Sequence, residues 1–326
     1  MNTGKSTSST PAGSDSNSAG GSRWKTPVMA WAILGLLFLV VQALIFGHWL
    51  MESDIRPAPY VGHEIATSRR VYSWVHQAIL SVALLGIAAY FLRHYRENRK
   101  VTFMAAVYVG WIFVFWQDPI AYYRTKVAVL NHSFISVSTW GPSIPGFHGA
   151  DPQSQIQHIV GGTGIGYGIT IFAILGVRAT LNLVCNPRRQ WKPHTLIPVA
   201  FILCVIMFTL VEMYYIRVAH AWAWIATYPG PTLFEGHWYQ MSVLGDVLYG
   251  LAMLPMVVMD RIARDRGTEV AALRGSDRLP TRAQPWSRIL AGVGLANACF
   301  LLLYIIPIAF LAQSGPPVPG TPVELW

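Results

Sequence analysis

Three acidic side chains lie within runs of mainly apolar residues, at Asp118, Glu212 and Asp246. An ionisable group in such a run is costly to bury and usually faces the interior of a helix bundle. Carboxyl groups in apolar surroundings can hold a proton near neutral pH and exchange it with a bound molecule. These three residues are therefore the candidate general acid and general base.

Histidine and aromatic residues lie at a similar depth in the sequence runs around the acids. The apolar run 71–92, which precedes the run containing Asp118, carries Ser73, His76 and Gln77. His220 follows Glu212 at i+8. We predict that His76 and His220 assist or orient the acids. Because four separate runs contribute polar groups, the pattern predicts one shared cavity. The candidate substrate-binding residues are Trp111, Phe115, Gln117, Tyr122, Trp140, His148, Tyr215, Tyr239, Ser242 and Tyr249.

Helical spacing predicts which of these side chains share a face. Behind Asp118, the residues Tyr108, Trp111 and Phe115 recur at helical intervals and predict one aromatic stripe. In the run 238–259, positions i, i+3, i+7 and i+10 predict a second polar face. Its members are Tyr239, Ser242, Asp246 and Tyr249.

Simpler interpretations exist for each of these features. An acid within a membrane span can bond to a neighbouring helix, and His76 can be a packing residue. Aromatic residues also form belts at membrane interfaces. The glycine-rich stretch 161–168 lacks the Lys-Ser/Thr pair of a phosphate loop, so it indicates close helix packing. The outer histidines show no HExxH or HxxxH spacing, and we expect no metal site.

Composition indicates an integral membrane protein. The chain has 326 residues, of which 53% are hydrophobic and only 12% are charged, whereas soluble domains carry about 25% charged residues. A bilayer needs roughly 20 apolar residues per helix. Seven runs meet this length, and we predict an all-α bundle of seven transmembrane helices. The predicted spans are 27–51, 71–92, 101–120, 159–183, 195–217, 238–259 and 286–312.

Loop charges predict the orientation of this bundle. Eighteen of the 24 Lys and Arg residues lie in the N-terminal tail and in alternate connections, which the positive-inside rule places in the cytoplasm. Most histidines and acids lie on the opposite side, so we expect the chemistry at the outer face. The net charge of +9 is thereby explained without a nucleic-acid partner. We predict a disordered cytoplasmic tail over 1–26, a membrane domain over 27–312 and an outer tail over 313–326.

Two loops on the outer side are rich in Pro, Gly and aromatic residues. The segment from Trp140 to His148 cannot form a regular helix and predicts ordered turns. The later loop contains the alternating stretch Ala221–Trp224, followed by Pro-Gly and Glu-Gly pairs. Both loops are expected to cover an apolar ligand, although they could instead rest at the level of the lipid headgroups. None of the three cysteines lies in a segment placed outside, so we predict no structural disulfide.

Several of these features together resemble the AveC-like spirocyclase family, over about residues 27–312. They are the helix end Gln117-Asp118-Pro119, the Trp140-Gly-Pro-x-x-Pro-Gly segment, the span carrying Glu212, and the Pro-Gly and Glu-Gly loop. The resemblance implies a bacterial protein of the cytoplasmic membrane that cyclises a dihydroxy-ketone, of polyketide type, to a spiroketal. Dehydration is also known in the family. No redox cofactor is implied.

This chemistry suits the acids, because losing water from a hemiketal needs a proton donor and a proton acceptor. We therefore expect a cyclase or dehydratase that acts on an apolar small molecule within the lipid bilayer. Two other classes remain open from the sequence. One is a non-catalytic lipid- or sterol-binding protein or a transporter, and the other is a membrane terpene cyclase. The residues do not indicate the substrate, the oligomeric state, or which acid is the donor.

Overall fold

A computed structural model describes residues 25–52, 65–149, 155–161, 163–184, 191–315, 320–322 and 325. Most of the predicted N-terminal tail and half of the predicted C-terminal tail, together with Asp54, Glu64, Asp151 and Cys185, lie outside these residues. Cys204 and Cys299 are buried free thiols. Within the described part, seven helical stretches are long and apolar enough to cross a membrane. This supports a membrane protein, while the orientation stays a prediction.

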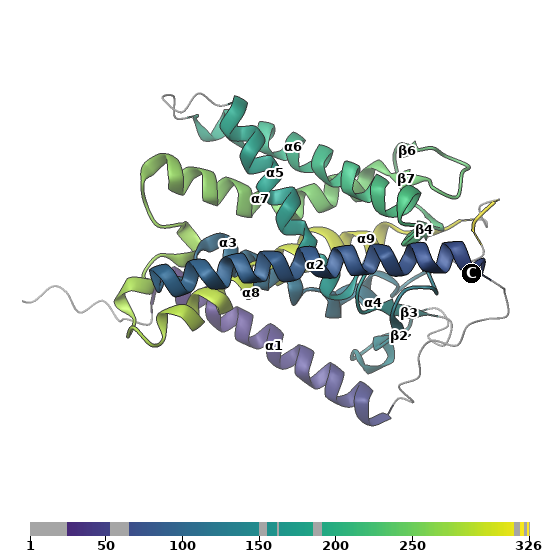
Figure 1. The fold of residues 1–326 in the computed structure, drawn as a ribbon, viewed down its shortest axis with the longest axis horizontal. Helices are drawn as coiled ribbons and strands as arrows, with labels where there is room; N and C mark the ends of the chain where they lie inside the picture. Colours follow the sequence, from purple (N-terminus) through teal and green to yellow (C-terminus); the bar gives the residue numbers. More distant parts are fainter. Residues whose placement is uncertain are drawn as a thin grey trace, which may run out of the picture.

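Most of the helical stretches run lengthwise through the molecule, and the first is inclined to the second (Figure 1). The first two are α1 (Pro27–Glu52) and α2 (Thr67–Asn98), and α2 extends well beyond the predicted run 71–92. Its extra turns carry Arg and Tyr residues, which are compatible with helix but too polar for a hydropathy window. The other stretches are α3 (Phe103–Ile112) with η1 (Phe115–Gln117) and α4 (Asp118–Ala121); η4 (Gly164–Ile169) with α5 (Thr170–Val184); α6 (Pro193–Met213) with η5 (Tyr214–Val218); α7 (Val243–Arg266); and α8 (Gln284–Phe300) with η8 (Leu301–Ile305) and α9 (Ile306–Leu311).

The third stretch is broken before Asp118. Pro119 lacks an amide hydrogen, and its ring would clash with the carbonyl of Phe115 in a continuous helix. The chain instead tightens into the 3₁₀ turn η1 and restarts as α4. The single aromatic stripe predicted behind Asp118 is therefore wrong. Tyr108 donates to the Leu84 carbonyl (2.7 Å), Trp111 stacks on Tyr249, and Phe115 packs with Phe46 and Trp140 elsewhere.

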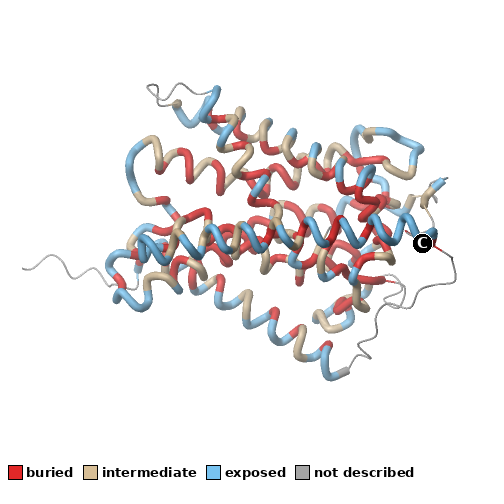
Figure 2. The backbone as a smooth tube through the Cα atoms, in the orientation of Figure 1, coloured by how far each residue is buried: buried red, intermediate tan, exposed pale blue. Residues whose placement is uncertain are grey.

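The helix α8 is the centre of the fold and has the most continuous buried surface (Figure 2). Small residues let its neighbours approach closely, as is common between membrane helices. A Cβ atom at Gly292 would lie 2.2 Å from the Ala106 carbonyl oxygen of α3. A Cβ atom at Gly294 would lie 2.2 Å from the Trp31 carbonyl oxygen of α1. Larger residues at either glycine would therefore push a helix away.

Four two-stranded antiparallel sheets gather at one end of the helices (Figure 1). The sheet of β1 (Ala128–Leu130) with β4 (Trp222–Trp224) joins the third connection to the fifth. The sheet of β2 (Ser136–Ser138) with β3 (Ile156–His158) lies within the third connection. The smaller pairs are β5 (Ala226–Thr227) with β8 (Gln313–Ser314), and β6 (Thr232–Leu233) with β7 (Met241–Ser242). The segment predicted as ordered turns contains η2 (Gly141–Ser143) and further turns.

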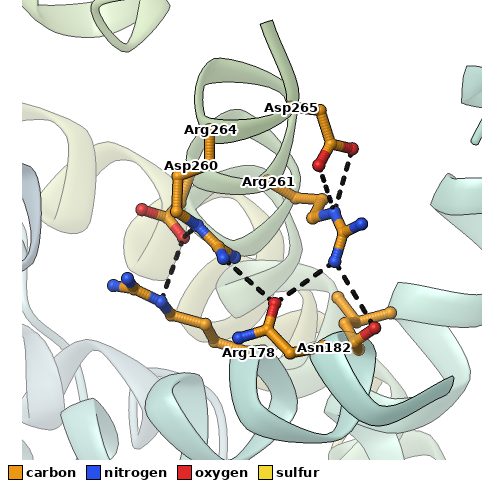
Figure 3. Close-up of polar contacts among 7 residues, drawn as sticks. Arg178, Asn182, Asp260, Arg261, Arg264 and Asp265 are labelled. Atoms are coloured by element: carbon orange, nitrogen blue, oxygen red, sulfur yellow. Dashed lines mark hydrogen bonds and ion pairs between the residues drawn. The ribbon is translucent and has the colours of Figure 1, made fainter. Parts of the chain in front are cut away.

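The opposite end of the bundle is held by ion pairs. The α7 side chains Asp260 and Arg264 bond at 2.8 Å, and Arg264 also donates to Asn182 of α5 at 3.0 Å (Figure 3). Arg178 of α5 lies 3.7 Å from Asp260, and Arg261 pairs with Asp265 at 2.9 Å. The connection from α7 to α8 contains η6 (Ala271–Leu273) and η7 (Ser276–Arg278).

Candidate active site

A small cavity lies inside the bundle near the end that carries the strands. Its volume is about 80 Å³. Residues from α4, η4, α5, α6, η5, α7 and η8 line it, together with β1 and β4. Two of the three candidate acids, Asp118 and Glu212, are on its wall. Residues far apart in the sequence thus meet around one cavity.

Asp118 reaches this cavity because the helix break places it in the first turn of α4. Its carboxyl is buried, and Oδ1 accepts a hydrogen bond from the Tyr167 hydroxyl at 2.8 Å. Its Oδ2 atom is buried and has no hydrogen-bond partner among the described residues. The neighbouring Tyr122 also lines the cavity, and burial, together with the Asp118 carboxylate, raises the pKa of this phenol. Tyr122 therefore stays protonated beside the acid.

Glu212 is held in the last turn of α6 by a neutral donor and by a second acid. The indole of Trp224, on β4, donates to Glu212 Oε1 at 2.6 Å. The carboxyls of Glu212 and Asp246 are in hydrogen-bonding contact, and the Thr209 hydroxyl donates to Asp246 Oδ2 at 2.8 Å. Carboxylates only accept hydrogen bonds, so a bond between two of them requires a proton on one. A proton on either acid would complete a bond between them.

Tyrosine and other aromatic side chains form much of the remaining wall. Tyr249 stacks on Phe208 with ring centres 3.7 Å apart, and its hydroxyl bonds to Thr170 at 2.8 Å. Tyr215 and Tyr304 come from η5 and η8, which are both π-helical turns. Such turns are rare and frequent at functional sites. Here each adds a residue to its helix and turns a tyrosine toward the cavity.

The two predicted histidines lie outside this wall. His76 bonds to the Tyr214 hydroxyl at 3.0 Å and packs against Phe134 and Tyr215. His220 has a left-handed backbone (φ 50°), and its ring contacts Trp238. The other predicted polar residues of the second span, Ser73 and Gln77, bond to the loop after β1 and do not line the cavity. Gln77 accepts from the Ile135 amide at 2.8 Å.

Four of the predicted substrate-binding residues pack behind or beside the cavity. Trp111 lies behind Tyr249 and donates to the Met256 sulfur at 3.3 Å. Gln117 donates to Asn297 at 2.8 Å. Trp140 donates to the Trp116 carbonyl at 2.9 Å and, with Phe115, belongs to the cluster packed against α1.

The loops contribute unequally to the cavity. Trp222 and Trp224 of the later loop line it, whereas none of its described lining residues comes from 140–148. His148 instead packs against the ring of Tyr123. The segment predicted as a lid therefore lies elsewhere on the same end, because its tryptophan is anchored to α1.

The predicted polar face in the sixth span is wrong, because α7 begins only at Val243. Ser242 is its N-cap, and its Oγ accepts from the Gly245 amide at 3.3 Å. Tyr239 lies before the helix, stacked on His237 and 4.5 Å from the Arg217 guanidinium. Asp246 and Tyr249 remain on the inner side of α7.

Four residues outside the predicted catalytic and substrate-binding residues contact the acids or the cavity directly. They are Tyr167, Thr209, Trp224 and Tyr304. Tyr167 lies in the glycine-rich stretch, where Gly168 allows the close packing that was predicted: a Cβ atom there would meet Leu84 and Ile112. A tyrosine between small residues was a usable signal. Thr209 and Tyr304 have no signal in an isolated helix pattern, and Trp224 was marked only as part of the later loop.

One further buried histidine, His158 on β3, was expected only as an outer-side residue. Burial lowers its pKa to about 3, while its Nε2 contacts the Asn131 carbonyl at 3.0 Å. It is therefore neutral at physiological pH. In the part of the chain that the structure describes, no group of three or more His, Cys, Asp or Glu residues is arranged to hold a metal ion.

Comparison with known proteins identifies the family. A family model described as "Spirocyclase AveC-like" matches residues 98–321. No curated protein and no solved structure gives a match. The matched region contains α3 to α9 and therefore every residue that lines the cavity. Because it covers more than half of the chain, this protein belongs to the AveC-like spirocyclase family.

Proposed function

We propose that this protein is a membrane-embedded cyclase or dehydratase that uses acid–base catalysis on an apolar hydroxy-ketone. Membership of the family supports a cyclase-type role, and the seven long apolar helices support a membrane location. The bacterial cytoplasmic membrane, a site near its outer face and a polyketide-like substrate belong to this proposal. The observation that carries it is the tyrosine-lined cavity with two carboxyl groups, Asp118 and Glu212, on its wall.

The partners of the two acids support different roles. Glu212 shares a proton with Asp246, so it is the proposed general acid. Asp118 receives a hydrogen bond from Tyr167 on one oxygen and has its other oxygen free, so it is the proposed general base. Donation from Tyr167 fixes the orientation of the Asp118 carboxyl toward the cavity. Two carboxyls with distinct surroundings can thus perform opposite proton transfers.

The reaction balances with these two groups alone. One substrate hydroxyl adds to the ketone and gives a hemiketal. Glu212 then protonates the hemiketal hydroxyl, which leaves as water and produces an oxocarbenium ion. The second substrate hydroxyl attacks this carbon while Asp118 takes its proton, so the net change in the substrate is loss of one water. Transfer of that proton from Asp118 back to Glu212, directly or through the released water, restores both groups for the next turnover. The electron-rich faces of Tyr249 and Tyr304 would stabilise the cationic intermediate.

The cavity is too small, at about 80 Å³, for a polyketide-sized ligand, since pockets for such molecules measure about 300–1,000 Å³. Substrate binding therefore requires the wall to open. The ladder between β1 and β4 has only three residue pairs, forms part of that wall and carries Trp224, so it is the proposed place of opening. Opening there would break the hydrogen bond from Trp224 to Glu212. Closure over the substrate would restore this bond to the proposed general acid.

The test is turnover by the purified full-length protein in detergent or lipid. It is incubated with a panel of dihydroxy-ketones of different chain lengths, and products are read by mass spectrometry as loss of one water. The control is the double variant Asp118→Asn, Glu212→Gln, which preserves size and removes proton transfer. We expect dehydrated or spirocyclic product only from the wild type.

Other outcomes identify the alternatives that the sequence left open. Binding of the same ketones without any mass change would contradict catalysis and favour a lipid- or sterol-binding protein. Cyclisation of a prenylated substrate, with no activity on hydroxy-ketones, would favour a membrane terpene cyclase. Equal product from the wild type and the double variant would refute the roles given to Asp118 and Glu212.

A further inference from the structure

A second cavity lies at the end of the molecule opposite the acids. It opens between the last turns of α2, the start of α3 and the start of α8, and its volume is about 820 Å³. Most of its wall is apolar or aromatic, including Phe91, Tyr95, Val109 and Trp286. This volume falls within the range of about 300–1,000 Å³ that is usual for small-molecule sites. One of its lining residues, Tyr108, also belongs to the hydrophobic core. None of the candidate acids lines it.

Two arginines line this groove. Arg99 caps the end of α2, and Arg282 precedes α8; both are exposed. No acidic residue is on the described wall, and neither guanidinium has an ion pair or hydrogen bond to another described residue. The adjacent basic residues differ, because Lys100 and Arg288 both pair with Glu269, at 3.0 and 2.9 Å. The groove therefore combines an apolar wall with two uncompensated positive charges.

The placement of the groove indicates which molecules reach it. The helices that form it are long and apolar enough to cross a membrane. Trp286, at the start of α8, is 68% exposed. Tryptophan in such a position is typical of the membrane interface. In the orientation predicted from Lys and Arg, this end lies in the cytoplasm, where the leaflet is rich in anionic lipid.

We propose that this groove is a binding site for one anionic phospholipid. The lipid phosphate lies between Arg99 and Arg282, and an acyl chain lies along Phe91, Val109 and Trp286. Charge complementarity selects the headgroup, because basic pockets between membrane helices on the cytoplasmic side bind anionic headgroups. The apolar wall selects a lipid over a soluble phosphate. The site is independent of the reaction proposed for the acids.

The charge test compares two double variants that lose the same net charge. The first is Arg99→Gln with Arg282→Gln. The matched control is Arg96→Gln with Arg266→Gln, since both of these arginines are exposed at the same end and neither lines the groove. Binding of phosphatidylglycerol and phosphatidylcholine to the full-length protein is measured by native mass spectrometry. We expect the first variant to lose about tenfold in phosphatidylglycerol affinity and the control to match the wild type.

The shape test leaves the charges in place. Ala105→Trp fills the groove, and Leu85→Trp is the control, because Leu85 is an exposed α2 residue away from the groove. We expect Ala105→Trp alone to exclude the lipid. Thermal unfolding of each variant shows whether it is folded, and a misfolded Ala105→Trp leaves the decision to the arginine pair.

Three results would overturn the proposal. One is equal phosphatidylglycerol binding by both arginine double variants, which would mean that the groove is empty or covered by another segment or a second copy of the chain. The second is equal affinity for the two lipids in the wild type. The third is full displacement of the lipid by millimolar glycerol phosphate, which would show a site for soluble phosphate.

Discussion

Buried or half-buried acids occur at both ends of the helix bundle, but their partners differ. At the end with the α7–α8 connection, Asp260 is bonded to Arg264 and lies near Arg178, and Glu269 is bonded to Arg288 and Lys100. At the strand end, Asp118 and Glu212 face neutral donors, Tyr167 and Trp224. An acid that is paired with arginine is fixed as an anion, whereas one with neutral partners can gain and lose a proton. The comparison separates structural acids from candidate catalytic ones.

The largest effect is expected from the acids that have neutral partners. Asp118→Asn and Glu212→Gln should each lower turnover by about 100- to 10,000-fold, because the amide cannot exchange the required proton. Thermal stability should change little. Turnover is measured by mass spectrometry of the water-loss product, and thermal stability by unfolding followed by fluorescence. The exposed Asp277→Asn serves as the control. Full turnover in either variant would remove that residue from the mechanism.

The reverse pattern is expected at the paired end. Arg288 is buried and donates to the Val101 carbonyl at 2.6 Å and to Ser276 and Glu269 at 2.7 and 2.9 Å. Arg288→Met should lower the free energy of unfolding by about 3 kcal/mol, because Glu269 and several polar groups lose their partner. Turnover per folded molecule should be unchanged. Denaturation and activity assays on the same preparation check both halves, and a loss of turnover alone would contradict the comparison.

A smaller effect should follow from removing the neutral donors. Tyr167→Phe deletes only the hydroxyl that bonds to Asp118 and should lower kcat about tenfold, with KM little changed. Phe retains the ring contact with Phe300. Steady-state kinetics separates the two constants. A change in KM alone would mean that Tyr167 contacts the substrate and does not position Asp118.

The smallest effect concerns pH at the paired end. Burial alone would raise the pKa of Glu269, but hydrogen bonds from Arg288 and Lys100 outweigh it and hold this pKa below its ordinary value of 4.5. A depressed carboxyl pKa gives stability that is fully present above 4.5 and is lost as pH falls through the lower folded value. The Tm should therefore fall more steeply below pH 4.5 in the wild type than in Glu269→Gln. Identical slopes would show that the ion pair contributes nothing.

Periodicity and charge were sufficient to predict the seven apolar helices, because burial in lipid imposes a run of about 20 apolar residues on each one. They also marked Asp118, Glu212 and Asp246, since an acid in such a run needs a partner or a role. What they could not predict is how a helix is interrupted. The 3₁₀ turn before Asp118 and the π-helical turns at Tyr215 and Tyr304 rotate side chains away from ideal spacing.

The sequence by itself thus determined the class of fold, the family resemblance and the identity of the three acids. Only the tertiary structure decided which side chains contact each acid. It joined Glu212 to Asp246 and Trp224, brought Tyr167 from a glycine-rich turn to Asp118, and moved Trp140 and Tyr239 away from the cavity. These contacts link residues in different helices and loops. They depend on packing between elements, and no local spacing along the chain encodes that packing.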